Sequence, residues 1–326
     1  MSFDSDVIVD RRRIRRKLTF WRVTAALVAI AAVVAIGAAS TSSGSLPGAA
    51  SGSIARIKID GLIRSDYDRV AALERLEKSS YEAVVVHINS PGGTTAGAEQ
   101  LYDSLVRLKA KKPLVVVVEG MAASGGYIAA LSADHIVARQ SSLVGSIGVL
   151  IQYPNLAELL KNVGVKVEEV KSSPLKAAPN GFEPTSPEAR AALDALVKDS
   201  YAWFRGLVKD RRSLDDPALD KVADGRVFTG RQAVGLKLVD QLGDEKTAVA
   251  WLVAQKKIKA DLPVRDYKLS PRLGDMTFLR TAAVVTLEAI GLPSLAQKVS
   301  AGGMLQAVDQ YGLDGILALW RPAASQ

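Results

Sequence analysis

Ser124 is the residue whose setting best suits catalytic chemistry. It lies in the string GMAASGGY, directly after an apolar run that predicts a strand and at the start of a predicted helix. The first turn of a helix offers unpaired N–H groups and the positive end of the helix dipole, which favour an alkoxide or a developing oxyanion. Gly125 and Gly126 would let a substrate backbone approach closely. The pattern suits both a nucleophilic serine and a serine that only caps the helix.

A second glycine-containing loop, Ser90 to Gly93 (SPGG), follows the apolar run of residues 83–89. Its Pro-Gly-Gly turn presents further backbone N–H donors, which could complete an oxyanion hole. If the two loops lie side by side, they form one acyl-transfer site. Tight turns without any catalytic role remain the alternative for both loops.

A nucleophilic serine needs a base, and the chain has only two histidines. His87 stands inside the predicted strand, in VVVHINSPGG, where a structural histidine is expected, and His135 is predicted near the far end of the helix that Ser124 begins. Neither is well placed to serve as the base. A lysine whose pKa is lowered by desolvation is the remaining choice.

Composition excludes several other kinds of site. The chain has no cysteine, so disulfides, thiolate nucleophiles and cysteine-ligated metals are excluded, and two histidines are too few for a His-rich metal site. No metal and no cofactor are expected. Of the net charge of +8, residues 1–22 supply +4, and no basic face interleaved with aromatic residues follows Arg22. A nucleic-acid partner is therefore not expected.

The order of apolar runs and glycine loops predicts an α/β fold with a parallel β-sheet and covering helices. Strands are predicted over residues 54–63, 83–89, 113–119, 136–138 and 165–171. Helices are predicted over residues 95–109, 123–133 and 186–211, with two shorter ones within 230–256. Both glycine loops then emerge at the carboxyl edge of the sheet, where α/β proteins place their ligand sites.

The amino-terminal part predicts membrane attachment. A basic cytoplasmic tail, residues 1–17, precedes an apolar segment, residues 18–39, and then a Ser/Gly/Ala-rich linker, residues 40–53. The uncharged core of the apolar segment rises about 26 Å as a helix, and its flanking residues extend it to the ~30 Å of a hydrocarbon core. Charge bias then places the remainder outside the cytoplasm. A cleaved signal peptide is the competing interpretation.

Several ordered motifs resemble the signal peptide peptidase A family, in its shorter, single-domain form. They are INSPGG (88–93), GMAASGGYIAALSAD (120–134), GSIGV (145–149) and DGRVFTGRQAVGLKLVDQLG (224–243). We therefore expect a peptidase domain over residues 54–256, with a fold like that of Clp protease and the crotonases. Residues 257–326 match no motif of the family and form a carboxyl-terminal extension of unknown role.

The resemblance implies roles for single residues. The family's nucleophile falls on Ser124 and its general base on Lys176, in KSSPLKAAP, with Lys171 as a rival five residues earlier. Ser146 would orient the base, unless it is only a turn serine. Oxyanion-hole amides are expected from Gly92 or Gly93 and from Gly125.

The function that the resemblance implies is a serine endopeptidase with a Ser-Lys dyad that cleaves remnant signal peptides. It would be a single-pass protein of the bacterial inner (cytoplasmic) membrane with its catalytic domain on the periplasmic side. A homo-oligomer is expected, because the shorter members draw the two catalytic residues from adjacent subunits. The alternatives are a catalytically silent membrane scaffold and a crotonase-type acyl-CoA enzyme, which would not require export.

Overall fold

The computed structural model describes residues 52–269 and 317–319, together with Trp21. Residues 52–269 and the strand at 317–319 belong to one compact unit. Apart from Trp21, the predicted tail, membrane segment and linker up to residue 51 lie outside the described residues. Within the described parts, no helix has the length and apolar character needed to cross a membrane.

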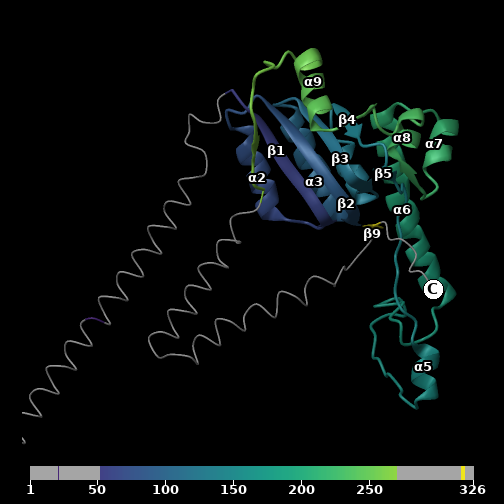
Figure 1. Cartoon of the computed structure of the whole chain (residues 1–326). Coiled ribbons are helices and arrows are strands. Elements are labelled where there is room, and N and C mark those ends of the chain that lie inside the picture. The colour runs from purple at the N-terminus through teal and green to yellow at the C-terminus, as the bar shows by residue number, and fades with distance from the viewer. Residues whose placement is uncertain (1–20, 22–51, 270–316, 320–326) are drawn as a thin grey trace, which may run out of the picture. The chain divides into compact units, whose positions relative to one another are not determined.

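The described chain alternates strands and helices as an α/β fold (Figure 1). The strands are β1 (Ile54–Ile63), β2 (Ala83–Thr94), β3 (Leu114–Ala123), β4 (His135–Ala138), β5 (Leu143–Gly145), β6 (Val227–Thr229), β7 (Gln241–Leu242), β8 (Val264–Asp266) and β9 (Leu317–Leu319). The helices are α2 (Tyr67–Glu77), α3 (Thr95–Lys109), α4 (Gly125–Ala130), α5 (Ala157–Asn162), α6 (Pro187–Arg212), α7 (Asp216–Val222), α8 (Gly230–Gly235) and α9 (Glu245–Lys256).

The described strands form one mixed sheet with a parallel centre. Its main order is β6-β5-β3-β2-β1-β8, with β4 also paired to β3 and β7 paired to β4. The pairings are parallel except for β5 with β6 and β2 with β9. The central strands are nearly continuous runs of Val and Ile, because a sheet covered on both faces buries successive side chains alike. The expected α/β class is confirmed, although the sheet is mixed where a parallel one was predicted.

Helices cover the two faces of this sheet. On one face, Ala248 and Leu252 of α9 pack into a buried cluster with Val85 of β2 and Val115 of β3. On the other face lie α3 and α4, with α2 packed beside α3 (Figure 1). The core therefore holds β2 and β3 rigidly, and their carboxyl ends open into the two glycine loops.

Residues 150–186 leave the body of the protein as an excursion beside α6 (Figure 1). Gly181 is the one buried residue in this range, and α5 buries none of its side chains. The excursion keeps its shape mainly by polar contacts, such as the Leu156 N–H to the Gly181 carbonyl at 2.7 Å. Its conformation therefore does not depend on a hydrophobic core of its own.

The structure corrects several predicted elements. The strand predicted over 165–171 is absent, because that segment lies in the excursion and has no neighbouring strand to pair with. The predicted helix over 123–133 is shorter, since it begins at Gly125 and ends at Ala130. The predicted break at Ser90 is instead an irregularity in the pairing, after which β2 continues to Thr94.

Candidate active site

Ser124 occupies a strained position between β3 and α4. Its φ of 53° and ψ of −118° lie in a region that residues with side chains rarely adopt, at a cost of about 1–3 kcal/mol. Its N–H donates to the Gly145 carbonyl at 2.8 Å, and its own carbonyl accepts from the N–H of Tyr127 at 2.9 Å. These bonds hold the sharp turn from strand to helix, which is the kind of turn that presents a nucleophilic serine in the α/β-hydrolases.

The Ser124 side chain is not used as a helix cap. It makes no capping hydrogen bond, although Ser124 precedes α4 directly and is only 1% exposed. Thr94, Ser186 and Thr229, by contrast, cap the helices that follow them. A capping role thus does not explain Ser124, and within the described residues no other hydrogen bond holds its hydroxyl.

Ser146 lies beside Ser124 at the same edge of the sheet. Ala123 and Gly145 are paired in the parallel ladder of β3 and β5, so the two serines follow paired residues. Ser146 repeats the positive φ, at 52°, and its N–H donates to the Arg226 carbonyl at 2.8 Å. The structure therefore brings together the predicted nucleophile and the predicted orienting serine.

The loop at Ser90–Gly93 meets the start of α4. A Cβ added to Gly126 would lie 2.7 Å from the Ser90 carbonyl oxygen, and one added to Gly93 only 1.8 Å from the Ile63 carbonyl oxygen. Both positions therefore require glycine, because backbone atoms fill the space of a side chain. Because of this close approach, the two glycine loops that the sequence singled out lie together and form one site.

The candidate oxyanion-hole residues differ in the hydrogen bonds that their backbone N–H groups already make. The Gly92 N–H donates to Ser90 Oγ at 3.1 Å, and the same hydroxyl donates to the Gly61 carbonyl at 2.6 Å. The Gly92 amide is therefore already engaged, and Gly93 lies in the ladders with both β1 and β9. Gly125 is the first residue of α4, where an amide has no carbonyl partner within the helix.

Lys176 lies apart from this cluster, on the excursion. It is exposed, and its N–H closes a turn to the Ser173 carbonyl at 3.1 Å. Among the described residues, neither a hydrogen bond nor an ion pair joins its amine to another side chain. The structure of the single chain therefore brings Ser124 and Ser146 together but not Lys176.

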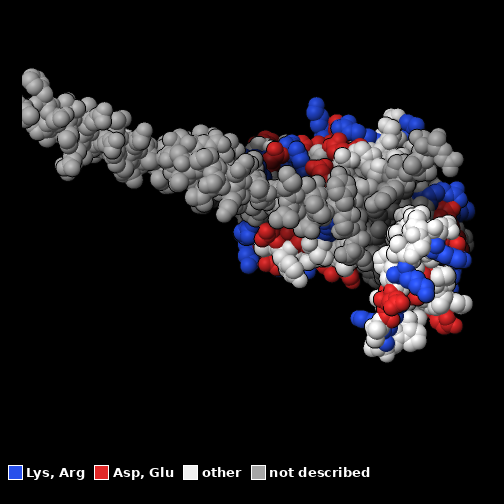
Figure 2. Space-filling view, turned by 90° about the horizontal axis from the view of Figure 1, so that it is seen from below, with Lys and Arg blue, Asp and Glu red and all other residues white. Residues whose placement is uncertain are grey.

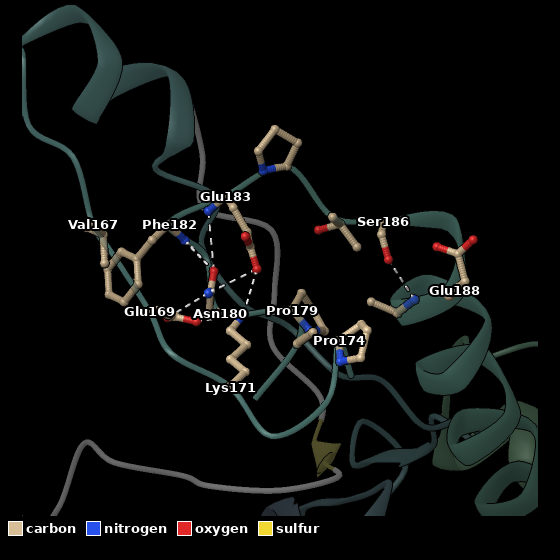
Figure 3. A pocket seen from close by; sticks show the side chains of 14 residues that line it. Val167, Glu169, Lys171, Pro174, Pro179, Asn180, Phe182, Glu183, Ser186 and Glu188 are labelled. Carbon is tan, nitrogen blue, oxygen red and sulfur yellow. Dashed lines mark hydrogen bonds and ion pairs between the residues drawn. The ribbon is translucent and has the colours of Figure 1, made fainter. Parts of the chain in front are cut away.

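Lys171, the rival base, is engaged in ion pairs. Its amine lies 2.6 Å from Glu169 Oε2 and 2.8 Å from Glu183 Oε1, at the edge of a pocket of about 460 Å³ (Figure 3). Hydrogen bonds to Glu169 and Glu183 raise the pKa of Lys171 above its ordinary value. A general base needs the opposite shift, so this environment argues against Lys171.

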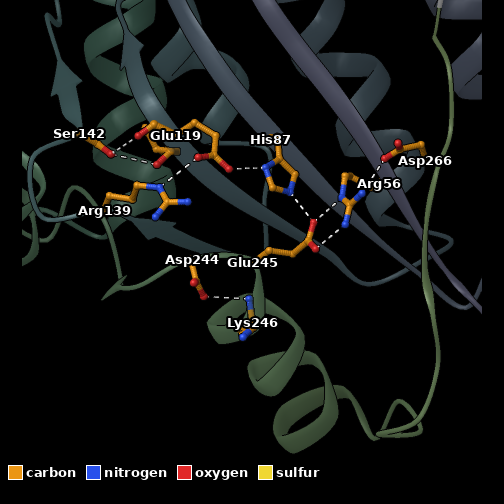
Figure 4. Close-up of polar contacts among 10 residues, drawn as sticks. Arg56, His87, Glu119, Arg139, Ser142, Asp244, Glu245, Lys246 and Asp266 are labelled. Atoms are coloured by element: carbon orange, nitrogen blue, oxygen red, sulfur yellow. Dashed lines mark hydrogen bonds and ion pairs between the residues drawn. The ribbon is translucent and has the colours of Figure 1, made fainter.

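His87 is a structural residue, as the sequence indicated. Its Nδ1 lies 2.7 Å from Glu119 Oε1, and its Nε2 lies 2.7 Å from Glu245 Oε2 (Figure 4). Arg56 hydrogen-bonds the same Glu245 carboxylate and thereby also ties α9 to β1. Because both ring nitrogens are occupied by carboxylates, His87 is not available to Ser124.

His135 lies elsewhere than predicted. It begins β4 instead of ending a helix, and its ring stacks on Trp251 with 4.7 Å between centroids. This is the amino end of a parallel strand, opposite to the edge that carries Ser124. In the part of the chain that the structure describes, no group of acidic and histidine side chains could hold a metal ion.

Sequence comparisons agree with the geometry of a buried serine at a strand-to-helix turn. Residues 106–259 match the family model described as Peptidase family S49. A putative protease of Synechocystis is 39% identical over 200 residues, covering 61% of this chain and 72% of the relative. A putative signal peptide peptidase SppA of Enterococcus faecium is 30% identical, covering 68% of each chain. Protease 4 of Salmonella typhi is 35% identical, covering 68% of this chain and 37% of that protein.

The protein is a serine peptidase. The chain belongs to peptidase family S49, and its relatives include proteins named Protease 4 and signal peptide peptidase SppA. The resemblance found in the motifs is thereby confirmed. A solved structure of a ClpP1 mutant from Listeria monocytogenes aligns with 59% of this chain at 14% identity and a TM-score of 0.41. The likeness to Clp protease and the crotonases therefore stays a prediction.

Proposed function

We propose that this protein is a membrane-anchored endopeptidase in which Ser124 of one subunit works with Lys176 of a neighbouring subunit. Its substrates are signal peptides left after the processing of exported proteins. The observation that carries the proposal is the division of the site. Among the described residues, no hydrogen bond joins the buried Ser124 hydroxyl to a basic side chain, and the predicted base stands exposed on an excursion.

The proposed chemistry follows from these positions. The neutral amine of Lys176 takes the proton of the Ser124 hydroxyl as Oγ attacks the carbonyl carbon of the scissile peptide bond. The amides of Gly93 and Gly125 receive the resulting oxyanion. The protonated amine then gives its proton to the leaving nitrogen, and water hydrolyses the acyl-enzyme by the same route in reverse. Ser146 holds the lysine amine in position during both steps.

The surface of the excursion supports a contact between subunits. Nine of the thirteen large hydrophobic side chains that are exposed among the described residues lie between positions 150 and 182. Figure 2, which looks at the molecule from below, shows uncharged residues over much of the excursion. An exposed apolar patch of this kind marks an interaction site. A head-to-tail contact between copies closes into a ring and gives each subunit an equivalent site.

The substrate class and the location rest on other observations. The Enterococcus relative carries the name of a putative signal peptide peptidase. The apolar segment of residues 18–39, preceded by a basic tail, would anchor the chain in the inner membrane with the peptidase domain on the periplasmic side. An enzyme anchored there stands close to signal peptides, which remain in the bilayer after their release. We also propose that the peptidase domain has a Clp-like fold.

A complementation experiment tests the divided site. Ser124→Ala and Lys176→Ala chains are purified separately, mixed under conditions that allow subunits to exchange, and assayed with a synthetic signal peptide by mass spectrometry. Each variant alone should be inactive. The mixture should recover activity, because some interfaces pair an intact Ser124 with an intact Lys176.

Two results would count against the proposal. Persistent inactivity after exchange has been verified with differently labelled subunits would mean that both residues act within one chain. Full activity of the Ser124→Ala chain alone would remove the nucleophile itself. A fluorophosphonate probe supplies the control for chemistry, because it should label the wild-type protein at Ser124 and leave Ser124→Ala unlabelled. A silent scaffold would label in neither chain.

A further inference from the structure

Strand β9 pairs with the candidate oxyanion loop. Leu317, Ala318 and Leu319 run antiparallel to β2, opposite Thr94, Gly93 and Gly92 respectively. This is the loop whose Ser90 carbonyl lies against Gly126, near the start of α4. Strand β9, which follows this loop by more than two hundred residues in the sequence, thus lies beside the candidate active site.

The pairing of β2 determines on which side β9 lies. At Gly92 and Gly93, one edge of β2 is already paired with β1. The other edge is paired with β3 only as far as Ser90, opposite Ala122, after which β3 turns into Ser124 and α4. Strand β9 therefore takes the edge that β3 vacates, and it also contacts α3 and α4. This edge faces the nucleophile.

We propose that the carboxyl-terminal segment around residues 317–319 is a built-in ligand of the peptide-binding groove and competes with peptide substrates. The proposal rests on the assignment of Ser124 as nucleophile. An extended peptide adds to an open strand edge through main-chain hydrogen bonds, which tolerate many sequences. The tail has the chemistry of such a peptide, because the run ILALW at residues 316–320 is apolar and uncharged.

Tethering makes even a weak ligand effective. A segment joined to the same chain is present at an effective concentration on the order of millimolar. A tail that binds with a dissociation constant near that value would occupy the groove about half of the time. An added peptide substrate must displace the tail, so the tail raises the apparent KM and leaves kcat unchanged at saturating substrate.

The test compares the full chain with two variants. The first ends after Gly312, and the second is the full chain with Ala318→Pro, which removes a main-chain N–H from β9. Ala318→Val is the matched control, because it keeps the N–H and favours a strand. We expect a KM about twofold or more lower for both the truncated chain and Ala318→Pro, an unchanged kcat, and no such fall in KM for Ala318→Val.

A binding measurement separates this proposal from the catalytic one. A fluorescent peptide of residues 313–322 is titrated into the truncated Ser124→Ala chain, which cannot turn it over, and a peptide with proline at position 318 is the control. Saturable binding of the first peptide alone supports the proposal. Equal KM values for all chains, together with absence of binding, would overturn it even if Ser124→Ala abolishes turnover. Unchanged turnover in Ser124→Ala would instead overturn the nucleophile assignment.

Discussion

The body of the protein and the excursion of residues 150–186 are stabilised by different kinds of contact. In the body, Val and Ile of β2 and β3 are fully buried, and the strained turn at Ser124 is held by backbone hydrogen bonds on both sides. In the excursion, Val163 is 63% exposed, and ion pairs and turns take the place of a core. The body has a packed hydrophobic core, whereas the excursion presents apolar side chains that stay exposed among the described residues.

This difference separates the two halves of the proposed dyad. A nucleophile on a strained turn needs a rigid surrounding, since a strained conformation persists only where neighbouring structure fixes it. A base that acts in the active site of a neighbouring subunit must extend away from the body of its own subunit. Substitutions in the two regions should therefore have different effects, and the largest effect is expected at the nucleophile.

Ser124→Ala should lower peptidase activity on the order of 10⁴-fold or more, because it removes the attacking oxygen. The fold should be unchanged, since alanine tolerates the turn as poorly as serine does and no side-chain hydrogen bond is lost among the described residues. Ser132→Ala is the matched control. Ser132 is buried near the end of α4 and donates to the Ala129 carbonyl at 2.7 Å, so its loss should cost about 1 kcal/mol of stability and little activity. Initial rates and thermal melts of both variants decide the outcome.

Lys176→Ala should lower activity by about 10²–10⁴-fold, whereas Lys171→Ala should change it little. Both lysines lie on the excursion, but Lys171 is held by Glu169 and Glu183. The rate of the wild-type enzyme should also rise with pH, because only a neutral amine can accept the serine proton. A larger loss in Lys171→Ala than in Lys176→Ala would reverse the assignment, and a flat profile from pH 6 to 10 would exclude a lysine base.

Val170→Asp should dissociate the proposed oligomer and reduce activity without changing the stability of the single chain by more than about 0.5 kcal/mol. Val170 is fully exposed on the excursion, so a charge there meets only solvent in the monomer. Tyr67→Asp is the control, because Tyr67 is an exposed hydrophobic residue of the body, on α2. Sedimentation velocity distinguishes the two. Equal assembly of both variants would show that the excursion does not form the contact.

The smallest effect concerns the attachment of α9 to the sheet. Hydrogen bonds from Arg56 and His87 hold the pKa of Glu245 below its ordinary 4.5. A depressed carboxylate pKa stabilises the fold fully above the unfolded value and loses that contribution as pH falls through the folded value. Glu245→Gln should therefore cost about 1 kcal/mol at pH 7 and less below about pH 4.5.

Thermal melts of wild type and Glu245→Gln across pH 3.5–7 measure this convergence. The pKa of Glu119 is shifted in the same direction. Burial raises this pKa, but hydrogen bonds from His87 and Arg139 outweigh burial and lower it. A difference between the two chains that stays constant with pH would mean that the carboxylate charge of Glu245 contributes nothing. Peptidase activity at pH 7 should be little affected, since His87 does not touch Ser124.

The sequence by itself determined the parts of the protein that depend on local pattern. Alternation predicted the strand at residues 54–63, and a continuous apolar run predicted the buried strand at 83–89. Helical patterns predicted α3 and α6 closely. The glycine loops marked the position of Ser124, and the order of the motifs identified the family. These features are readable because periodicity, turn residues and motif order do not require knowledge of distant contacts.

Tertiary structure decided what depends on partners far away in the chain. Alternating residues at 165–171 predicted a strand, but a strand needs a neighbour and that segment has none. No local signal showed that Ser124 would take a positive φ, that the Gly92 amide would be bound by Ser90, or that β9 would lie along Gly92–Thr94. The position of β9 follows from where β3 leaves the sheet. The place where one strand departs from its neighbour is set by the packing of the whole body, and no short stretch of sequence encodes it.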